Sequence, residues 1–442
     1  MYALYSALLA LSLLLTLPYW LLQMMRHGKY RAGLKQRLGQ VPPGLASGAG
    51  KPAIWVHAVS VGEVVASSGV IEQLQNKFAS YRVVVSTTTD TGQKLAVRRF
   101  GQENVFYFPL DFRFAIRPFL RALRPELVVI AETEFWPNFI RLAKLSGASI
   151  AVINGRISDG SLSGYKRLRF WLPRVLNNVD QFLAQSEGDR RRMIEIGATE
   201  AKVSVAGNLK FDVAPPPAPA IVASLRESLS QSGALPVLVC GSTVEEEEGS
   251  LLSAFRNILA NHPKTVMILA PRHPERFEEV GALVETLGFR MLRRSLWSGE
   301  SLAGSVLLLD SIGELAALYS LATVAFVGGS LVPRGGHNIL EPALYGVPVV
   351  TGNHYENFRD IVNFFLSRDA VRVVGLAELP LVFMELIENP AAREALGHNA
   401  LEALELQRGA TQRTLDALVQ LLSDRGTSSS AINGSPRVEG RA

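Results

Sequence analysis

The sequence predicts an α/β protein of two domains, each built around a parallel β-sheet. Short stretches that are apolar throughout alternate with longer amphipathic stretches, and this alternation occurs in two successive series. Strands without polar alternation are typical of a parallel sheet that helices cover on both faces. The chain of 442 residues is also longer than one hydrophobic core ordinarily holds, which favours two domains.

Composition and charge narrow the classes of function. With 48% hydrophobic and 19% charged residues, the chain has the composition of a folded protein. Its one cysteine, Cys240, excludes an internal disulfide framework and fits the cytosol. The net charge of +5 suits nucleic acid, an anionic membrane surface or an anionic substrate as partner. Because the sequence has no zinc-finger, RNP or helix-turn-helix pattern, we expect no nucleic-acid partner.

The first segment predicts a membrane anchor. Residues 2–25 are uncharged and long enough to cross the roughly 30 Å hydrocarbon core, with Tyr2 and Tyr5 near one end and Tyr19 and Trp20 near the other. The segment lacks the basic start and the small-residue cleavage site of a signal peptide. Positive charge follows it instead, which predicts an uncleaved transmembrane anchor at 1–25 with the bulk of the chain in the cytoplasm. These positive residues are Arg26, Lys29, Arg31, Lys35 and Arg37.

A helix that lies in the membrane interface remains the alternative. Pro18 and the polar Ser12 and Thr16 weaken the span and favour this second arrangement. In either case we expect the protein to work at a membrane surface, with its basic residues against anionic headgroups.

The first βαβα series predicts a domain at 26–212. Its predicted strands are AIWVHAV, YRVVVST, NVFYFPL, LVVIAE, SIAVING, QFLAQS and VSVAGN. Stretches of helical period, such as VASSGVIEQLQNKF, lie between them. The proline-rich segment at 213–220 then suits an interdomain linker.

The second series predicts a domain at 221–425. Its predicted strands are LPVLVCGST, KTVMILAP, SVLLLD, VAFVGGS, VPVVTG and AVRVV. Two such Rossmann-like domains are expected to face each other across a cleft lined by the carboxyl ends of both sheets, where ligands bind. The small polar residues of 426–442 predict a disordered tail.

A glycine-rich turn in the second domain predicts an anion site. Gly335 and Gly336 follow the strand VAFVGG and precede a helix expected to start near His337 or Asn338. Backbone amides and the positive end of a helix dipole attract anions there. Glu341, in the expected first turn, could accept both hydroxyls of a ribose. The plainer interpretation is a tight turn with a carboxylate that only complements the dipole.

Cations near this turn would add to the anion site. Arg272 and His273 directly follow the strand KTVMILAP, and Arg272 could clamp a phosphate with two hydrogen bonds. Lys210, in GNLKFD, could add charge from the domain junction, although a solvated hinge lysine is an equal alternative. The glutamates at 245–248 predict an exposed helix start, and neither zinc-ligand spacing nor paired aspartates is present, so we expect no metal.

The first domain offers the acid–base groups. Glu132 and Glu134 end the strand LVVIAE, and one of the two is expected to contact substrate while the other is structural. Arg156, in NGRIS, is a further cation facing the cleft. In HAVSVGE, Gly62 would let the acceptor approach the backbone and Glu63 would be a general base. A glutamate that only stabilises its helix is the alternative for Glu63.

Taken together, the anchor and six motifs resemble the 3-deoxy-D-manno-octulosonic acid (Kdo) transferase family of lipid A assembly. The motifs are HAVSVGE, ETEFWPN, NGRIS, GNLKFD, APRHPER and GGHNILEPALYGVPVV. The resemblance implies a GT-B glycosyltransferase that moves Kdo, with inversion, from CMP-Kdo to the glucosamine disaccharide of a lipid A precursor (lipid IVA). The family's base matches Glu63, in an S-x-G-E motif that begins at Ser60. Its nucleotide-binding residues match Arg272, the turn from Gly335 to Asn338, and Glu341.

The resemblance also implies where and how the protein works. Transfer would need neither a metal nor a cofactor, because cationic side chains can offset the charge of the leaving CMP. The acceptor stays in the bilayer, which implies the cytoplasmic face of the bacterial inner membrane, with inner-membrane lipids as partners. Two alternatives stay open: a sugar-nucleotide epimerase of the same fold, and a non-catalytic membrane tether that binds nucleotide sugars.

Overall fold

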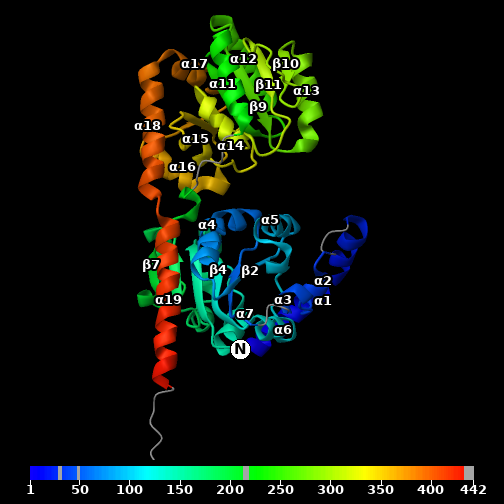
Figure 1. Ribbon diagram of the computed structural model, residues 1–442, viewed down its shortest axis with the longest axis vertical. Coiled ribbons are helices and arrows are strands. Elements are labelled where there is room, and N and C mark those ends of the chain that lie inside the picture. The colour runs from blue at the N-terminus through cyan, green and yellow to red at the C-terminus, as the bar shows by residue number, and fades with distance from the viewer. Residues whose placement is uncertain (28–31, 47–49, 213–218, 433–442) are drawn as a thin grey trace, which may run out of the picture. The chain divides into compact units, whose positions relative to one another are not determined.

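The chain folds into two compact units, each with a seven-stranded parallel sheet (Figure 1). The computed structural model describes all residues except 28–31, 47–49, 213–218 and 433–442. Unit 1 comprises Met1–Asp212 and Arg408–Ala442, and unit 2 comprises Val213–Gln407. The predicted α/β class with two parallel sheets is confirmed.

The sheet of unit 1 has the strand order β3-β2-β1-β4-β5-β6-β7. Its strands are β1 (Ala53–His57), β2 (Arg82–Thr87), β3 (Val105–Tyr107), β4 (Pro125–Ala131), β5 (Ser149–Gly155), β6 (Gln181–Ala184) and β7 (Val203–Val205). The chain moves outward from β1 to β3 and then returns to place β4 on the other side of β1. The carboxyl ends of β1 and β4 therefore flank the point where the strand order reverses, which is the usual ligand site of such sheets.

Helices cover both faces of this sheet, as its apolar strands predict. One face packs against α6 (Arg113–Leu123), α7 (Pro137–Leu145) and α9 (Leu172–Leu176), around Trp55. The other face packs against α4 (Val61–Lys77), α5 (Asp90–Phe100) and α19 (Ala410–Ile432). The other helices are α1 (Tyr2–His27), α2 (Leu34–Arg37), α3 (Pro43–Ala46), α8 (Asp159–Arg167) and α10 (Glu187–Glu195), with 3-10 turns at Gln102–Asn104, Glu200–Lys202 and Leu209–Phe211.

The sheet of unit 2 has the order β10-β11-β9-β8-β12-β13-β14. Its strands are β8 (Val237–Thr243), β9 (Val266–Pro271), β10 (Arg290–Arg293), β11 (Ser305–Leu308), β12 (Val324–Val327), β13 (Val349–Gly352) and β14 (Arg372–Val374). The strand order reverses between β8 and β12, so a second ligand position lies at their carboxyl ends.

Helices also cover both faces of the second sheet. They are α11 (Ala220–Ser232), α12 (Glu248–Asn261), α13 (Phe277–Thr286), α14 (Leu315–Leu318), α15 (Leu340–Ala343), α16 (Arg359–Leu366), α17 (Leu379–Glu388) and α18 (Pro390–Gln407). Short 3-10 turns lie at Pro274–Arg276, Tyr319–Leu321 and Glu356–Phe358. Buried aromatic rings, among them Phe255, Phe326 and Phe383, fill one of the two cores.

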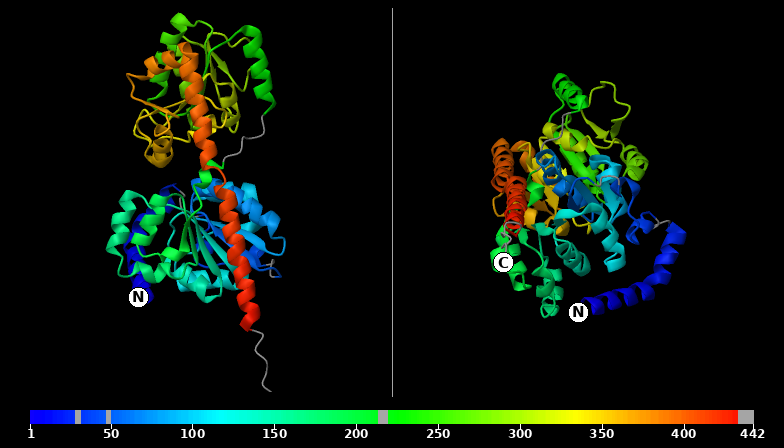
Figure 2. Two further views of the ribbon diagram at one scale, coloured as in Figure 1. Left: turned by 90° about the vertical axis from the view of Figure 1, so that its left-hand side faces the viewer. Right: turned by 60° about the horizontal axis from the view of Figure 1, so that its bottom comes forward.

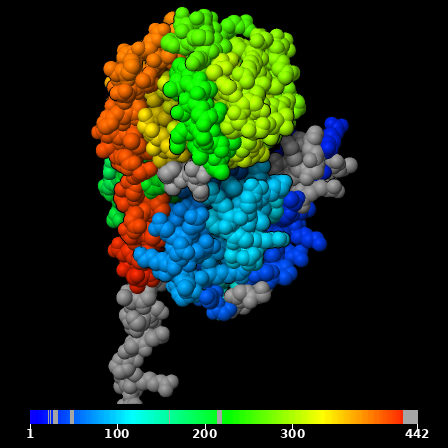
Figure 3. All heavy atoms as spheres, turned by 45° about the horizontal axis from the view of Figure 1, so that its top comes forward, coloured from blue at the N-terminus to red at the C-terminus, as the bar shows by residue number. Residues whose placement is uncertain are grey.

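The end of the chain returns to unit 1, which corrects the expected domain at 221–425. The Asp212 carboxylate accepts hydrogen bonds from the amides of Gly409 and Thr411, and Arg413 Nε donates to the Ala206 carbonyl at 2.8 Å. Helix α19 then packs against α4 of unit 1 (Figures 2 and 3). Gly409, with φ of 91°, separates α18 from α19 and is a local sign of a helix boundary, but only the tertiary contacts show that the chain returns to unit 1 there.

The tail and linker expectations have separate outcomes. Helix α19 extends to Ile432, so the predicted disorder from residue 426 is wrong up to that point. Residues 433–442 and most of the expected linker, 213–218, lie outside the described residues. Ala220, assigned to the linker, is the first residue of α11.

Helix α1 has the extent expected of the anchor. Within the part of the chain that the structure describes, its Tyr2–Trp20 segment is the one helix long and apolar enough to cross a membrane. The expectation that the basic residues after α1 all face lipid headgroups is only partly met. Arg37 donates to the Thr88 carbonyl and lies 4.8 Å from the Tyr107 ring centre, so this guanidinium binds the protein itself. Lys29 and Arg31 lie outside the described residues.

The packing of α19 makes a stability prediction. Leu418→Ala removes a fully buried side chain between α19 and the first sheet, so we expect the free energy of unfolding to fall by about 2–5 kcal/mol. Urea unfolding measures the loss, and hydrogen exchange should show it in α4 and α19. Leu406→Ala is the control, because Leu406 is 58% exposed. Loss of protection in unit 2 instead of α4 would contradict the assignment of α19 to unit 1.

Candidate functional site

The predicted acid–base residues of unit 1 lie at neighbouring strand ends. Glu63 follows β1, Glu132 and Glu134 follow β4, and Arg156 follows β5. Because β1, β4 and β5 are adjacent in the parallel sheet, these side chains gather at its carboxyl edge, beside the reversal of strand order.

Glu63 is held at the start of α4 by a variant of the capping box, in which its carboxylate reaches the amide of Val59 instead of that of the N-cap residue Ser60. Ser60 is the N-cap residue, and its Oγ donates to Glu63 Oε1 at 2.9 Å while it accepts the Glu63 amide at 3.4 Å. The Val59 amide donates to Glu63 Oε2 at 2.8 Å. The sequence S-x-x-E before an apolar helix builds this arrangement. Glu63 therefore does stabilise its helix, and the same bonds fix the direction of its carboxylate.

The environment of Glu63 suits a general base. Burial raises the pKa of Glu63 to about 7, the hydrogen bonds from Val59 and Ser60 work against this rise, and the charges of Glu132 and Glu134 add to it. A base is most effective when its pKa lies near the working pH. Gly62 is exposed, and a Cβ placed on it would meet only Ser60 Oγ, at 3.8 Å. The backbone beside Glu63 is therefore open to a bulky acceptor.

Glu132 and Glu134 are placed by an unusual turn after β4. Glu132 has φ of 56°, a left-handed conformation that is costly for a residue with a side chain, and its amide donates to the Ile153 carbonyl at 2.8 Å. Both side chains are half-buried. Burial and then the charge of Glu132 raise the pKa of Glu134, against a hydrogen bond with Trp136. The structure thus brings three carboxylates together, and which of the two contacts substrate stays a prediction.

Asn154 ties two of the sequence motifs together. It is buried at the end of β5 with φ of 52°, and its Oδ1 accepts the Leu209 amide at 3.0 Å. NGRIS and GNLKFD therefore form one structure, with Arg156 on the first motif and Lys210 on the second. Lys210 belongs to unit 1, so its predicted contact with an anion in unit 2 stays a prediction.

His57 is a polar group that the sequence analysis did not single out. It ends β1, is fully buried, and stacks on Phe108 with ring centres 3.9 Å apart. Its Nδ1 lies 3.0 Å from Ser86 Oγ, whereas its Nε2 has no hydrogen-bond partner among the described residues. Burial lowers the pKa of His57 to about 3, so the ring is neutral. Its place inside an apolar strand hid it, because a buried histidine in a strand has no distinctive sequence signal.

In unit 2, the predicted donor-binding residues form one cluster. Burial raises the pKa of Glu341, against a hydrogen bond with Asn338 and the charge of Arg272. Burial lowers the pKa of His337 to about 4, and the charges of Arg272 and His273 add to this. These interactions place the side chains at 272–273, 337–338 and 341 within electrostatic reach of one another. Arg272 and His273 are exposed, which leaves them open to a ligand.

The glycine-rich turn differs from its prediction. Helix α15 begins at Leu340 rather than near His337 and has only one turn, so its dipole contributes little. Gly335 and Gly336 have φ of 86° and 74°, which favours glycine at both, but the Gly336 amide already donates to the Gly329 carbonyl. Asn338 Oδ1 accepts the Leu340 amide at 3.2 Å. Side chains, rather than helix amides, therefore dominate this site.

A buried carboxylate accepts hydrogen bonds from the backbone amides that follow β12. Glu247 Oε2 accepts the amides of Val244 at 3.0 Å and Gly329 at 2.7 Å, and its Oε1 accepts those of Ser330 and Leu331, both at 2.8 Å. Glu247 is fully buried. The prediction that all four glutamates at 245–248 lie on an exposed face is therefore wrong for Glu247, which joins the ends of β8 and β12, and also for Glu248, which is 1% exposed.

Glu248 similarly holds the loop that carries Arg272. It is 1% exposed, accepts a hydrogen bond from Thr243 Oγ1 at 2.9 Å, and pairs with Arg276 through both carboxylate oxygens, at 2.6 and 3.2 Å. Arg276 ends the motif APRHPER. Glu247 and Glu248 thus fix the glycine-rich turn and the Arg272 loop to the same strand end. Both partners lie more than 25 residues away in sequence, so no local pattern could have identified them.

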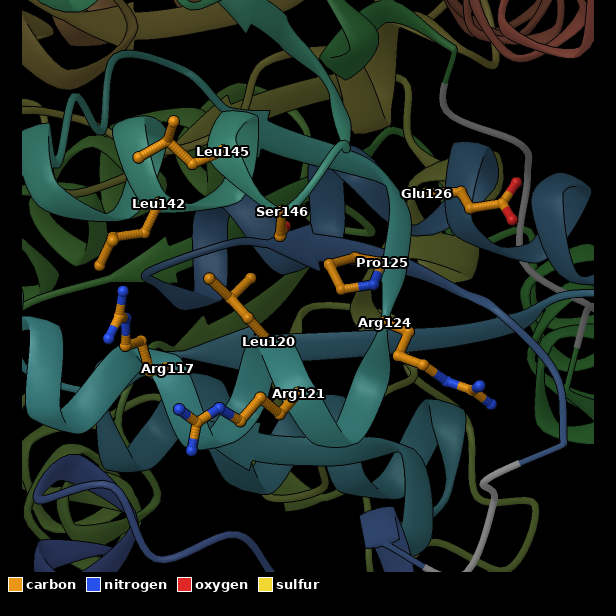
Figure 4. Close-up of a pocket in the computed structure, with 9 residues that line it drawn as sticks. All are labelled: Arg117, Leu120, Arg121, Arg124, Pro125, Glu126, Leu142, Leu145 and Ser146. Carbon is orange, nitrogen blue, oxygen red and sulfur yellow. The ribbon is translucent and has the colours of Figure 1, made fainter. Parts of the chain in front are cut away.

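Two further observations concern metal binding and a pocket in unit 1. Among the described residues, no group of three or more histidine, cysteine, aspartate or glutamate side chains could hold a metal ion. A pocket of 570 Å³ at the ends of α6 and α7 contains none of the predicted site residues (Figure 4). It lies where β4 begins, at the opposite edge of the sheet from Glu63.

The bracing role of Glu247 makes a prediction. Glu247→Gln turns one acceptor oxygen into a donor that faces two backbone amides, so we expect the free energy of unfolding to fall by about 2–5 kcal/mol. Chemical denaturation measures this loss. Glu245→Gln is the matched control at an exposed position and should change stability by less than about 0.5 kcal/mol. Equal effects of the two substitutions would contradict the role of Glu247.

Sequence comparisons identify relatives over nearly the whole chain. Residues 32–213 match the family model described as 3-deoxy-D-manno-octulosonic-acid transferase (kdotransferase). The 3-deoxy-D-manno-octulosonic acid transferase of Haemophilus influenzae is 34% identical over 94% of this chain and 97% of its own length. The enzyme of the same name from Bordetella pertussis is 35% identical over 83% of this chain and 86% of its own length.

Solved structures agree on the fold. A glycosyltransferase from Rickettsia africae has a TM-score of 0.53 at 14% identity and covers 85% of this chain and 99% of its own. A UDP-GlcNAc 2-epimerase from Neisseria meningitidis has a TM-score of 0.53 at 15% identity and covers 83% of this chain and 100% of its own. Likeness at this identity shows the GT-B fold alone. With that fold and with relatives above 30% identity along the chain, this protein belongs to the Kdo transferase family of glycosyltransferases.

Proposed function

We propose that this protein transfers Kdo, with inversion, from CMP-Kdo to the glucosamine disaccharide of a lipid A precursor in lipopolysaccharide biosynthesis. Family membership supports Kdo transfer. The observation that carries the mechanism is Glu63, a fixed carboxylate whose pKa is raised to about 7. It lies where β1 and β4 diverge, beside open backbone at Gly62.

In the proposed step, Glu63 accepts the proton of an acceptor hydroxyl. The acceptor oxygen attacks C2 of Kdo from the face opposite the phosphate. The bond from C2 to the phosphate oxygen breaks, and CMP leaves with the bonding electrons. Ser60 and the Val59 amide hold the carboxylate in place, so little reorganisation is needed when the proton moves. Glu132, Glu134 and Arg156 are the proposed contacts of acceptor or Kdo.

Unit 2 is the proposed donor-binding unit. Arg272 and His273 would bind the phosphate, Glu341 the ribose hydroxyls, and the turn at Gly335, Gly336 and Asn338 the rest of the nucleotide. Lys210 would add positive charge. CMP carries less charge than a nucleoside diphosphate, so we propose that these cations suffice without a metal or cofactor.

The epimerase alternative shares the fold but not the relatives, because the epimerase structures are about 15% identical to this chain. A non-catalytic tether would not need a carboxylate with a pKa near neutrality. Helix α1 supports the cytoplasmic face of the bacterial inner membrane as the place of action, where the acceptor's acyl chains remain in the bilayer.

Mass spectrometry of the acceptor tests the reaction. Full-length protein incubated with fresh CMP-Kdo and a tetraacylated lipid A precursor should add one or more Kdo masses, equally with and without a chelator. Glu63→Gln should lower the transfer rate about 10²–10⁴-fold and leave CMP binding intact. Glu72→Gln, an exposed glutamate on the same helix, is the matched control. Unchanged transfer by Glu63→Gln would remove Glu63 from the mechanism, and an unmodified acceptor would reopen the substrates.

The pKa of Glu63 predicts a pH profile. Below pH 7 this carboxyl is increasingly protonated and cannot accept a proton, so kcat/KM should fall with an acidic limb near pH 7. Glu132→Gln removes a nearby negative charge, lowers the pKa of Glu63 and should move the limb to lower pH. Glu72→Gln should leave the limb in place. A limb that does not move in Glu132→Gln would contradict coupling of these carboxylates.

A further inference from the structure

The first turn of α1 is fastened to unit 1 by specific contacts. The Tyr2 ring lies 4.4 Å from the Arg141 guanidinium carbon, and the Tyr5 and Trp171 ring centres are 5.7 Å apart. Asn138 Nδ2 donates to Ser6 Oγ at 3.0 Å. These partners belong to α7 and to the segment that leads into α9, so the start of the apolar helix lies on the globular unit itself.

The segment after α1 is also fastened to unit 1. Gln36 Oε1 in α2 accepts the Tyr107 amide at 2.7 Å, and Arg37 binds the Thr88 carbonyl. A helix of the length of Tyr2–Trp20 rises about 28 Å, which is the thickness of the hydrocarbon core. If it crossed the bilayer, Tyr2 and α2 would lie on opposite sides and could not both contact one globular unit.

Side-chain exposure along α1 follows one helical face. Tyr2, Tyr5, Ser6, Leu9 and Leu13 are half-buried, at the spacing of a single stripe. The leucines on the remaining surface, Leu4, Leu8, Leu11, Leu14 and Leu15, are 52–72% exposed. Figure 2 shows α1 starting beside unit 1 and running along its periphery. The helix therefore presents an apolar face away from the protein along its length.

Helix α6 places arginines next to this start. Arg113, Arg117 and Arg121 recur every four residues and form no ion pair with any described residue. Like charges at this spacing destabilise a helix unless an anion offsets them. Partial desolvation, together with the charges of Arg113 and Arg121, lowers the pKa of Arg117. A groove of 500 Å³ joins these three arginines to Ser6 of α1 and to Phe114, which is 60% exposed.

Two more surfaces near α1 combine arginine with apolar groups. Phe170 is 78% exposed, and the neighbouring Arg167 and Arg169 are exposed, directly before the Trp171 that contacts Tyr5. In Figure 4, Arg117 and Arg121 of α6 line a pocket together with Leu142 and Leu145 of α7. Guanidinium groups beside exposed apolar side chains are the composition that anionic headgroups and their acyl boundary favour.

We propose that α1 lies in the plane of one leaflet as a monotopic anchor, and that the arginines of α6 together with Phe114 and Phe170 bind anionic phospholipid headgroups of that leaflet. Two observations favour anionic lipid as the ligand of these surfaces. They adjoin the apolar face of α1, and their arginines carry positive charge. Unit 1 would then contact the membrane through α1 and through two further surfaces, one at α6 and Phe114 and one at Phe170. This membrane binding goes beyond the proposed function and does not depend on turnover.

The anchor's topology can be measured by depth in the bilayer. Leu4→Cys, Leu11→Cys and Leu22→Cys, which share one helical face, are made one at a time in the full-length chain and carry a nitroxide label; Cys240 is buried and does not compete. In vesicles with phosphatidylglycerol, an in-plane helix gives all three labels a similar depth of about 5–10 Å. A label at Leu11 near the bilayer centre, with those at Leu4 and Leu22 shallow, would establish a spanning helix and overturn the proposal. Labels that all stay in water would overturn it too.

A second measurement tests the arginines. A label at Phe114→Cys should contact the bilayer increasingly as the phosphatidylglycerol fraction rises, and Arg117→Gln with Arg121→Gln should abolish this increase. Arg98→Gln with Arg99→Gln is the matched control, since these adjacent exposed arginines lie on α5, at the other face of the sheet. Equal effects of the two pairs, or equal contact with phosphatidylcholine vesicles, would overturn headgroup binding. Protection of the label without vesicles would identify self-association instead.

The results of these membrane experiments can be distinguished from those of the Kdo-transfer assay. Depth is measured without donor or acceptor, so a failed depth profile leaves Kdo transfer untouched. Absence of transfer in the mass-spectrometry assay leaves the membrane geometry untouched.

Discussion

Parallel strand pairing is the constraint on which the rest of this structure depends. Every strand in both sheets runs in the same direction as its neighbours, so each connection crosses over and all carboxyl ends meet at one edge of the sheet. Where the strand order reverses, consecutive loops diverge and leave room for a ligand. Glu63 lies at the reversal of the first sheet and Glu247 at that of the second. The proposed base of unit 1 and the buried brace of unit 2 therefore both lie at positions that the topology creates.

The two glutamates show how environment divides one residue type into two roles. Glu247 accepts four backbone amides and is wholly enclosed, so its carboxylate serves to join two loops. Glu63 accepts one amide and one hydroxyl, and its burial, together with the charges of Glu132 and Glu134, disfavours its ionised form. The first arrangement saturates the oxygens, whereas the second leaves a carboxylate that gains from taking up a proton.

The first helix is also positioned by contacts with the globular unit. The contacts of Tyr2, Tyr5 and Ser6 with unit 1 fix one end of an apolar helix, and α2 fixes the segment beyond it. For the proposed acceptor, which would remain in the bilayer, a fixed height of unit 1 would help the reacting hydroxyl to meet the proposed base, Glu63. In the proposed membrane geometry, the two attachments of α1 and α2 and the arginines of α6 would set this height more rigidly than a flexible tether.

The fold class, the apolar first helix and the motifs that carry family membership could all be predicted from the amino-acid sequence. Apolar strands, helical period and local signals such as S-x-x-E at Ser60 depend on neighbours within a few residues, so they can be read directly from the chain. Other features depend on distant partners. The return of α19 to unit 1, the burial of Glu247 and Glu248, the late start of α15 at Leu340 and the internal use of Arg37 were all missed. Apart from the start of α15, where Asn338 Oδ1 accepts the nearby Leu340 amide, each is decided by a contact between segments far apart in sequence, which only the folded chain brings together.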